Sequence, residues 1–368
     1  MTQKKLKDIC DKGSSNLKQK DVEALSGEYP VFGASGLINN IPFYQQETDY
    51  IAIVKDGSGI GRVVFLPAKS SVIGTMQYIL PKKGYNIKYI AYCLQSLDLS
   101  KYKQGAAIPH IYFRDYGERV VNVTESEQEQ ERIVAYLDMQ FAKIDAMKAN
   151  AAKALAEAKA LFQSVLTEAM TPKEGWIIIE FGKTCSFIRG PFGGSLKKDC
   201  FKDSGYAVYE QQNAIYNRFT FRYFVDQNKF NEMRRFATKE GNLIMSCSGT
   251  IGRVAIIPHN APLGIINQAL LMIEPKCFNK YFLKYYMESS IFKDIIVKNS
   301  DGAAIKNIAS VSVLKSINVS LPPLPEQERI VTRLDALSAK VAALEGNYTQ
   351  TVAECDALKQ ALLREVFE

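Results

Sequence analysis

The 368-residue sequence has only two histidines, one tryptophan and no apolar run of the roughly 18 residues that a transmembrane helix needs. Its seven cysteines form no Cys-x-x-Cys pair, so zinc knuckles are not indicated and reduced thiols are expected. The basic residues at the N-terminus precede no apolar stretch, so no signal peptide is predicted. We expect a soluble, cytoplasmic protein with no membrane partner.

Motifs for cofactors and catalysis are also missing. Residues 57–62 resemble a dinucleotide loop, but Arg62 replaces its last glycine and a strand pattern follows, which favours a β-hairpin turn. Residues 182–184 resemble the end of a phosphate loop, but Ile177 stands where its first glycine belongs. No Asn-Pro-Pro-Tyr or Asp-Pro-Pro-Tyr is present, and neither His110 nor His259 lies in a hydrolase signature. We therefore expect a non-catalytic chain without cofactor or metal.

The net charge of +7 is divided unevenly along the chain. Residues 1–124 hold 16 Lys+Arg against 11 Asp+Glu, and residues 173–321 hold 20 against 12. Residues 125–172 and 322–368 each hold 5 against 8, so basic and acidic sections alternate twice. Basic globular sections favour a polyanionic partner.

A sequence repeat explains this alternation. Residues 129–168 align without a gap on residues 326–365, with close to half of the positions identical. The identities include Glu-Arg-Ile-Val and, three residues later, Leu-Asp. One long period of this kind indicates a duplicated domain rather than a solenoid.

Both copies of the repeat are predicted to be long helices. Ser126 with Glu129 can form a capping box, Pro325 suits a first helical turn, and Pro172 ends the first helix. Apolar residues at steps of three and four indicate a coiled-coil seam. The seam residues are Leu137, Ile144, Met147 and Leu161 in the first helix, and Leu334, Leu337, Val341, Leu344, Leu358 and Leu362 in the second. Pairing with each other is favoured over packing on separate cores.

The two basic sections contain short β-branched runs bounded by Gly, Pro and Asn, together with one amphipathic helix each. The runs are 51–54 and 63–66 in the first section and 243–245, 254–257 and 270–273 in the second; the helices are 87–97 and 280–291. The sequence thus predicts an α+β fold. Two globular mixed α/β domains (1–124 and 173–321) alternate with two long helices (125–172 and 322–368) that pair as an antiparallel coiled coil, with an internal pseudo-twofold repeat.

The junction between the second domain and its helix resembles a known family. Residues 321–330 read Leu-Pro-Pro-Leu-Pro-Glu-Gln-Glu-Arg-Ile, and residues 129–133 keep the core of this motif without the prolines. Together with Tyr29–Gly36 and the Gly-Ala-Ala-Ile segments at 105–108 and 302–305, this resembles the specificity subunits of type I restriction–modification systems. The resemblance covers essentially the whole chain and implies two target-recognition domains and two spacer helices.

The resemblance also implies partners. Members bind double-stranded DNA, and two modification subunits that carry S-adenosylmethionine assemble on them. Restriction subunits that hydrolyse ATP then join. Each domain would read one half of an asymmetric, bipartite site, and the helices would set the gap. The alternative is a coiled-coil scaffold that binds no nucleic acid, which gives no reason for the segregated positive charge.

Candidate DNA-binding residues follow from loop position and charge. Arg62 and Arg253 are equivalent, each after a glycine, and each is either a DNA contact or a structural anchor. Other candidates are Lys101, Lys103 and Gln104 before the first Gly-Ala-Ala-Ile segment, Lys298, Asn299 and Lys306 around the second, and, for phosphate, the cluster Arg234, Arg235 and Lys239.

Overall fold

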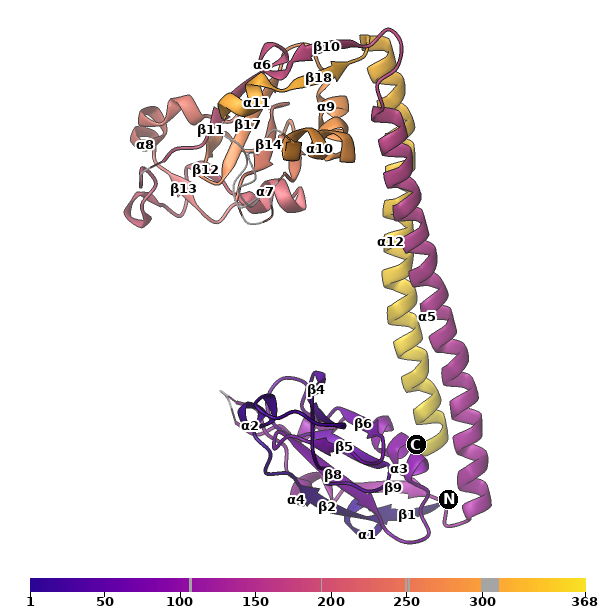
Figure 1. Cartoon of the computed structure of the whole chain (residues 1–368). Helices are drawn as coiled ribbons and strands as arrows, with labels where there is room; N and C mark the ends of the chain where they lie inside the picture. Colours follow the sequence, from indigo (N-terminus) through magenta and orange to yellow (C-terminus); the bar gives the residue numbers. More distant parts are fainter. Residues whose placement is uncertain (106–107, 193, 249, 251, 299–310) are drawn as a thin grey trace. The chain divides into compact units, whose positions relative to one another are not determined.

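A computed structural model describes the whole chain except residues 106–107, 193, 249, 251 and 299–310 (Figure 1). The chain forms two compact units: unit 1 is Met1–Lys153 with Asn347–Glu368, and unit 2 is Ala154–Gly346. Two long helices, α5 (Glu127–Met170) and α12 (Leu324–Phe367), each contribute to both units. The limits of the four predicted sections stay a prediction, because the units divide the chain within these helices.

Unit 1 holds the first globular domain, called domain 1. Its elements are β1 Thr2–Lys5, α1 Leu6–Ile9, β2 Cys10–Ser14, α2 Gln19–Glu23, β3 Tyr29–Gly33, β4 Gly36–Ile41, β5 Tyr50–Val54, β6 Val63–Leu66, β7 Ser71–Val72, β8 Met76–Pro81, α3 Ile87–Ser96, the 3-10 helix η1 Leu99–Tyr102, α4 Phe113–Tyr116 and β9 Val120–Val123.

Unit 2 holds domain 2. Its elements are β10 Ile177–Glu180, α6 Phe181–Thr184, β11 Cys185–Arg189, η2 Lys198–Cys200, β12 Tyr206–Tyr209, α7 Gln211–Tyr216, β13 Phe224–Val225, α8 Gln227–Glu232, η3 Arg234–Phe236, β14 Leu243–Ser246, β15 Val254–Ile256, β16 Gly264–Ile266, β17 Leu270–Pro275, α9 Lys280–Glu288, α10 Ser290–Lys298, α11 Val311–Ser316 and β18 Asn318–Leu321.

The two domains share one topology. Their four-stranded sheets have the orders β2-β8-β5-β6 and β11-β17-β14-β15, and their three-stranded sheets the orders β4-β3-β7 and β13-β12-β16. In each three-stranded sheet the central strand pairs antiparallel with one neighbour and parallel with the other. Each domain begins and ends in a two-stranded antiparallel ribbon, β1-β9 or β10-β18. The predicted α+β fold and its internal repeat are confirmed.

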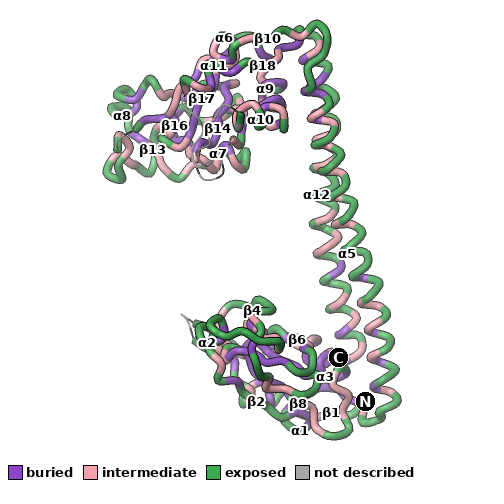
Figure 2. Tube along the Cα trace, in the orientation of Figure 1, coloured by how far each residue is buried: buried purple, intermediate pink, exposed green. Residues whose placement is uncertain are grey.

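Local sequence explains the sheet cores and the helix starts. Every residue of β5 is buried, as expected for an apolar run in the interior of a sheet (Figure 2). Asn86 caps α3 by accepting from the Tyr89 amide at 3.1 Å, and Asn279 caps α9 in the same way at 2.9 Å from the Tyr281 amide. The amphipathic patterns predicted at 87–97 and 280–291 therefore begin at equivalent capped positions.

The first turn of each long helix carries a buried glutamine whose side chain bonds to the backbone of the preceding domain. The Gln130 amide oxygen accepts from the Asn86 backbone N–H at 2.6 Å, and its nitrogen donates to the carbonyls of Gly84 and Thr124, both at 3.0 Å. Gln327 likewise accepts from the Asn279 N–H at 2.7 Å and donates to the Pro322 carbonyl at 2.9 Å. The junction motif is thus a docking device.

Other residues of the junction motif surround this glutamine. Ser126 caps α5 by accepting from the Glu129 amide at 3.3 Å, but the Glu129 carboxylate pairs with Arg132 at 2.7 Å, so the predicted capping box is only half formed. Glu326 and Arg329 form the same pair at 2.7 Å. The Tyr92 hydroxyl donates to Asp138, and the Tyr285 hydroxyl to Asp335 at 2.7 Å. The repeated Leu-Asp pair therefore docks α3 and α9 against the long helices.

The far end of each long helix completes the core of the other domain. Leu363 and Phe367 of α12 are buried in the core of domain 1, where the Phe367 ring lies 5.3 Å from that of Tyr89. Leu166 and Met170 of α5 are buried in the core of domain 2. Each domain therefore holds the start of one helix and the end of the other.

The helices run antiparallel, as ion pairs show within each unit. Asp145 pairs with Lys359 at 2.6 Å and Lys148 with Asp356 at 2.8 Å in unit 1, so numbers rise on α5 as they fall on α12. Lys159 and Glu345 pair in unit 2. The predicted antiparallel pairing is confirmed.

The predicted phase of the seam needs a correction. Leu137, Ile144 and Leu334 are buried, and Leu337, Val341 and Leu362 are half-buried. Four other predicted seam residues are exposed: Met147 by 54%, Leu161 by 57%, Leu344 by 38% and Leu358 by 46%. On α5 the half-buried positions are their neighbours Lys148 and Phe162. From Leu137 onward, the inward-facing residues of α5 are therefore spaced by four and then three residues, not by three and then four. The sequence did not reveal this spacing because exposed apolar residues such as Met147 and Leu161 lie beside the seam.

We predict that Gln130→Ala lowers the free energy of unfolding by about 1–3 kcal/mol, because it leaves a backbone N–H and two carbonyls without their partner. Urea denaturation followed by tyrosine fluorescence measures this change. Gln128→Ala, an exposed position on the same turn, is the matched control and should change stability by less than about 0.5 kcal/mol. Equal effects of the two substitutions would contradict the docking role.

Candidate nucleic-acid interface

A polar hollow of about 560 Å³ lies in domain 1 at the ends of β2 and β5 and the start of β8. Five of its lining residues, 110–114, come shortly after the Gly-Ala-Ala-Ile segment in the sequence. Residues 106–107 of that segment lie outside the described part of the chain. The hydrogen-bonding or charged side chains that line it are Lys12, Ser14, Lys55, Asp56, Gln77, His110, Tyr112 and Arg114.

Contacts among these side chains hold the hollow in a defined arrangement. The His110 Nδ1 lies 2.7 Å from the Asp56 carboxylate, whose other oxygen lies 3.8 Å from the Lys55 ammonium. The Arg114 guanidinium lies 4.7 Å from the centre of the Tyr112 ring, a cation–π contact. Lysine, arginine and amide groups beside an exposed aromatic ring have the chemistry to contact base edges and phosphates.

The equivalent strand ends of domain 2 carry different chemistry. The Lys55 N–H bonds to the Thr75 carbonyl and the Cys247 N–H to the Ala269 carbonyl, both as the chain leaves the sheet. This register places Cys247 and Ser248 where domain 1 has Lys55 and Asp56. It also places Arg189 at the position of Ser14, and Leu271 at that of Gln77. The Gln211 amide reaches this end of the sheet and donates to the Ser248 hydroxyl at 2.5 Å.

Sequence reasoning missed most of this hollow. In domain 1 it placed the contacts at Arg62 and just before the Gly-Ala-Ala-Ile segment. Lys55 and Asp56 instead follow strand β5, and residues 110–114 follow that segment. Charged residues directly after a buried strand run were the available signal, because strand ends expose the side chains that follow them.

The loop residues predicted from the sequence lie in varied settings. Gln104 exchanges two backbone bonds of 2.8 Å with His110, and its side chain donates to Asp115 at 2.8 Å, so it shapes the loop beside the hollow. Lys101 is exposed, 3.9 Å from Asp98. Lys103 and Lys298 are exposed, and Asn299 and Lys306 lie outside the described residues.

Arg62 and Arg253 occupy matching hairpin turns, β5–β6 and β14–β15. Gly61 and Gly252 have φ of +82° and +78°, the left-handed region that favours glycine, and both arginines are exposed. The predicted hairpin turn at 57–62 is present. Arg62 donates to the Ala34 carbonyl, so at least one of its donors anchors the turn.

The predicted phosphate cluster divides into two kinds of cation. Arg234 and Arg235 are exposed on η3, and no acidic side chain of the described residues forms an ion pair with them. Lys239 pairs with Glu274 at 2.7 Å, and this hydrogen bond raises the pKa of Lys239. The two arginines are therefore the more available anion contacts.

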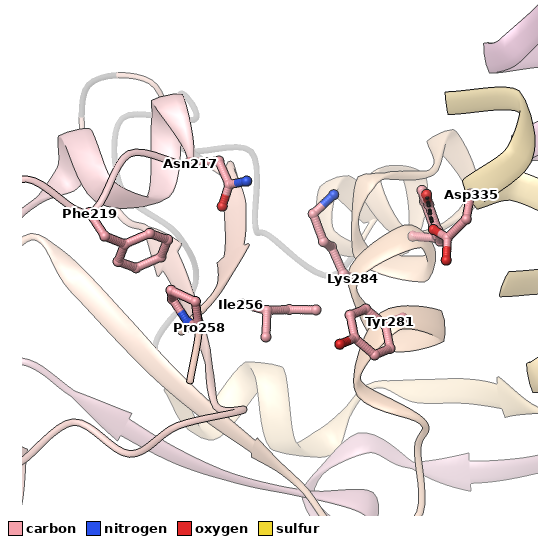
Figure 3. Close-up of a pocket in the computed structure, with 8 residues that line it drawn as sticks. Asn217, Phe219, Ile256, Pro258, Tyr281, Lys284 and Asp335 are labelled. Atoms are coloured by element: carbon pink, nitrogen blue, oxygen red, sulfur yellow. Dashed lines mark hydrogen bonds between the residues drawn. The ribbon is translucent and has the colours of Figure 1, made fainter. Parts of the chain in front are cut away.

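A second hollow, of about 470 Å³, lies in unit 2 beside α9 (Figure 3). It is lined mainly by apolar and aromatic groups, with Lys284 and Asn217 at its edge; the apolar and aromatic members are Phe219, Ile256, Pro258, Tyr281 and Tyr285. Tyr285 and Asp335, which form the hydrogen bond of the junction, also line it. Its chemistry does not favour an anion.

The helix pair has two unlike faces. On α5, at about 100° per residue, Asp145, Lys148 and Lys159 lie on one flank of the seam and Met147 and Leu161 on the other. The ion pairs join this flank of α5 to the corresponding flank of α12. Within each unit, the exposed apolar residues therefore lie on the opposite flank.

This apolar face has one pair of residues in each unit. By the register of the ion pairs, Met147 is level with Leu358 in unit 1, and Leu161 with Leu344 in unit 2. The two pairs are also equivalent under the repeat, since Met147 aligns with Leu344 and Leu161 with Leu358.

Within the described ranges, no cluster of three or more His, Cys, Asp or Glu side chains is arranged to hold a metal ion. Nor does any helix there combine the length and apolarity needed to span a membrane. Burial raises the pKa of the Cys10 and Cys185 thiols to about 12, which keeps them protonated and unreactive at neutral pH.

Comparison with known proteins fits this geometry. The family model for the type I restriction modification DNA specificity domain matches residues 1–156 and 189–353. The chain belongs to this family. Among curated members, the specificity subunit of type I restriction enzyme EcoKI from Escherichia coli K12 is 28% identical over 200 residues, covering 52% of this chain and 42% of that protein. The StySPI specificity subunit from Salmonella potsdam is 25% identical over 197 residues, again 52% of this chain and 42% of the relative. These matches span less than half the length of either relative.

Solved structures share the fold of this specificity-domain chain. A chain from a structure describing the assembly and conformational transition of the type I R-M system has a TM-score of 0.73 at 16% identity, covering 99% of this chain and 96% of that one. The HsdS subunit from Thermoanaerobacter tengcongensis has a TM-score of 0.52 at 17% identity, covering 99% and 95%.

Proposed function

We propose that this chain is the DNA-specificity subunit of a type I restriction–modification complex and acts in the cytoplasm. Each domain reads one half of a bipartite, asymmetric site in double-stranded DNA, and the helix pair sets the unread gap. The chain itself catalyses nothing. Two modification subunits bring S-adenosylmethionine, and restriction subunits bring ATP hydrolysis.

This proposal rests on one observation: the two domains share their fold but have different side chains at equivalent strand ends. Both domains share strand order, register and the glutamine junction, yet at matching strand ends domain 1 presents Lys55 and Asp56, whereas domain 2 has the buried Cys247 and the half-buried Ser248. Two readers of different half-sites need this combination, because base edges are distinguished by the placement of donors and acceptors. A scaffold gives no reason for it.

The helix pair supports the assembly with modification subunits. Its apolar face offers two equivalent pairs of residues, one in each unit, and so matches two copies of one partner. Exposed apolar groups on a helical surface favour packing against partner helices. The opposite, ion-paired face has its charges already satisfied.

For the hollow in domain 1, we predict that Arg114→Ala weakens binding to the cognate site by about 1–3 kcal/mol and relaxes one position of the first half-site. The second half-site should be unchanged. Selection of bound duplexes from a random pool, using the complex with modification subunits, measures both effects. Arg119→Ala, an exposed arginine outside the hollow, is the control. Relaxation in both half-sites, or in neither, would contradict this placement.

For assembly, we predict that Leu358→Glu with Met147→Glu reduces the number of bound modification subunits from two to one, because it places two carboxylates on one of the apolar pairs. Native mass spectrometry counts the subunits. The control is Lys148→Glu with Asp356→Lys, which reverses an ion pair on the opposite face and should retain both. Retention of two subunits by the apolar-pair variant would place docking elsewhere.

For the gap, we predict that seven residues inserted after Ala154 and after Thr351 keep both half-sites and widen the unread gap by about three base pairs. One heptad adds about 10 Å of helix and keeps the seam in register, and duplex DNA rises about 3.4 Å per base pair. Methylation mapping reads the new site. A heptad variant that changes the bases read but not the gap would place specificity in the helices.

A further inference from the structure

A groove of about 680 Å³ lies within unit 1, where domain 1 meets the last turns of α12. Apolar and aromatic groups line part of it, among them Phe65, Tyr92 and Phe141. Its charged and amide groups come from two parts of the chain: Arg62, Gln95 and Asp98 from domain 1, and Lys359, Gln360 and Arg364 from α12.

Two guanidinium groups in this groove remain available for an anion. The Lys359 ammonium is held by Asp145 at 2.6 Å, and the Asp98 carboxylate accepts the Ser100 N–H at 3.2 Å as a cap. Arg62 is exposed and uses one of its five donors on the Ala34 carbonyl. Arg364 is exposed, and no carboxylate in the described part of the chain forms an ion pair with it.

We infer that this groove seats a backbone phosphate of the bound DNA between Arg62 and Arg364, with the amides of Gln95 and Gln360 as further donors. Arginine suits this task because its planar fork donates two parallel hydrogen bonds to phosphate oxygens. The end of α12 thereby becomes part of the DNA surface of domain 1. This inference rests on the proposed function, which assigns no DNA contact to the helices.

The phosphate seat belongs to the first half-site alone. The sequence repeat places Phe162 and Thr167 of α5 where α12 has Lys359 and Arg364. The hollow beside α9 in unit 2 shares with this groove only Ile256 and Tyr285, the counterparts of Phe65 and Tyr92, and no residue of α5 lines it. Arg364 of α12 accompanies Arg62 in the groove. The equivalent position of α5 is Thr167, so Arg253 has no corresponding arginine on a long helix.

If Arg364 had only a structural role, its removal would have different consequences. A cation in the last turn of a helix is favoured by the partial negative charge of that helix end. Removing Arg364 would then lower thermal stability and leave the salt dependence of DNA binding unchanged. A phosphate contact does the reverse, because each one releases a counterion and steepens the dependence of affinity on salt.

The test compares Arg364→Gln with Arg333→Gln in the complex with modification subunits. Arg333 is also an exposed arginine of α12, 3.7 Å from Glu168 and outside the groove. We expect Arg364→Gln to weaken binding about tenfold near physiological salt and to lower the slope of log affinity against log salt by about one. The selected bases and the melting temperature should stay as in the wild type, and Arg333→Gln should match the wild type throughout.

Phosphate ethylation interference locates the contact. The wild-type complex should show interference at a phosphate beside the first half-site that Arg364→Gln no longer shows, with the second half-site unaltered. Wild-type affinity and slope in Arg364→Gln, or a lower melting temperature with an unchanged slope, would overturn the inference while leaving the proposed function intact. A wild-type complex that selects no DNA sequence would overturn the proposed function itself.

Discussion

The closing of each domain's core by the far end of the other domain's helix is the constraint on which this structure depends. Domain 1 is incomplete until Leu363 and Phe367, at the end of the chain, join its core, and domain 2 needs Leu166 and Met170. The ring centres of Phe367 and Tyr89 lie 5.3 Å apart, although most of the sequence separates the two residues. A slip in the register of the helix pair would withdraw these side chains, so the seam and both cores specify one another.

This constraint separates what must stay constant from what is free to vary. The buried glutamines, the Tyr–Asp bonds and the helix ends fix where each sheet begins and ends relative to the helices. Just beyond the strand ends, Lys55 and Asp56 of domain 1 and Ser248 of domain 2 are half-buried and outside the cores, whereas Cys247 is buried in the core of domain 2. Under the proposed function, changes at Lys55, Asp56 or Ser248 alter recognition with little cost in stability, since substitutions away from the core change stability little.

Features with a strong periodic or repeated signal could be predicted from the sequence. The duplication, the strands, the paired helices and the hairpin turn at 57–62 follow from identity, alternation and glycine position, and the structure has them. The phase of the seam was wrong because the exposed Leu161 and Leu358 also fit a heptad. The docking role of Gln130 and the hollow around His110 join residues far apart in the chain. The charged residues after β5 were a local signal for the hollow, but no local pattern specifies which residues meet there.

The charge of the chain is divided between basic globular domains and acidic helices, and this division bears on which surface faces which partner. The helices carry an excess of acid, and Lys148, Lys159 and Lys359 pair with carboxylates across the seam, so the helix pair does not favour a polyanion. Under the proposed function, their apolar face is then left for the modification subunits. The end of α12 differs, because there Arg364 stands in a groove whose other wall is the basic domain 1. Under the proposed function, with a phosphate seat at Arg364, the DNA surface extends from the globular domain onto the helix only where the helix also completes that domain's core.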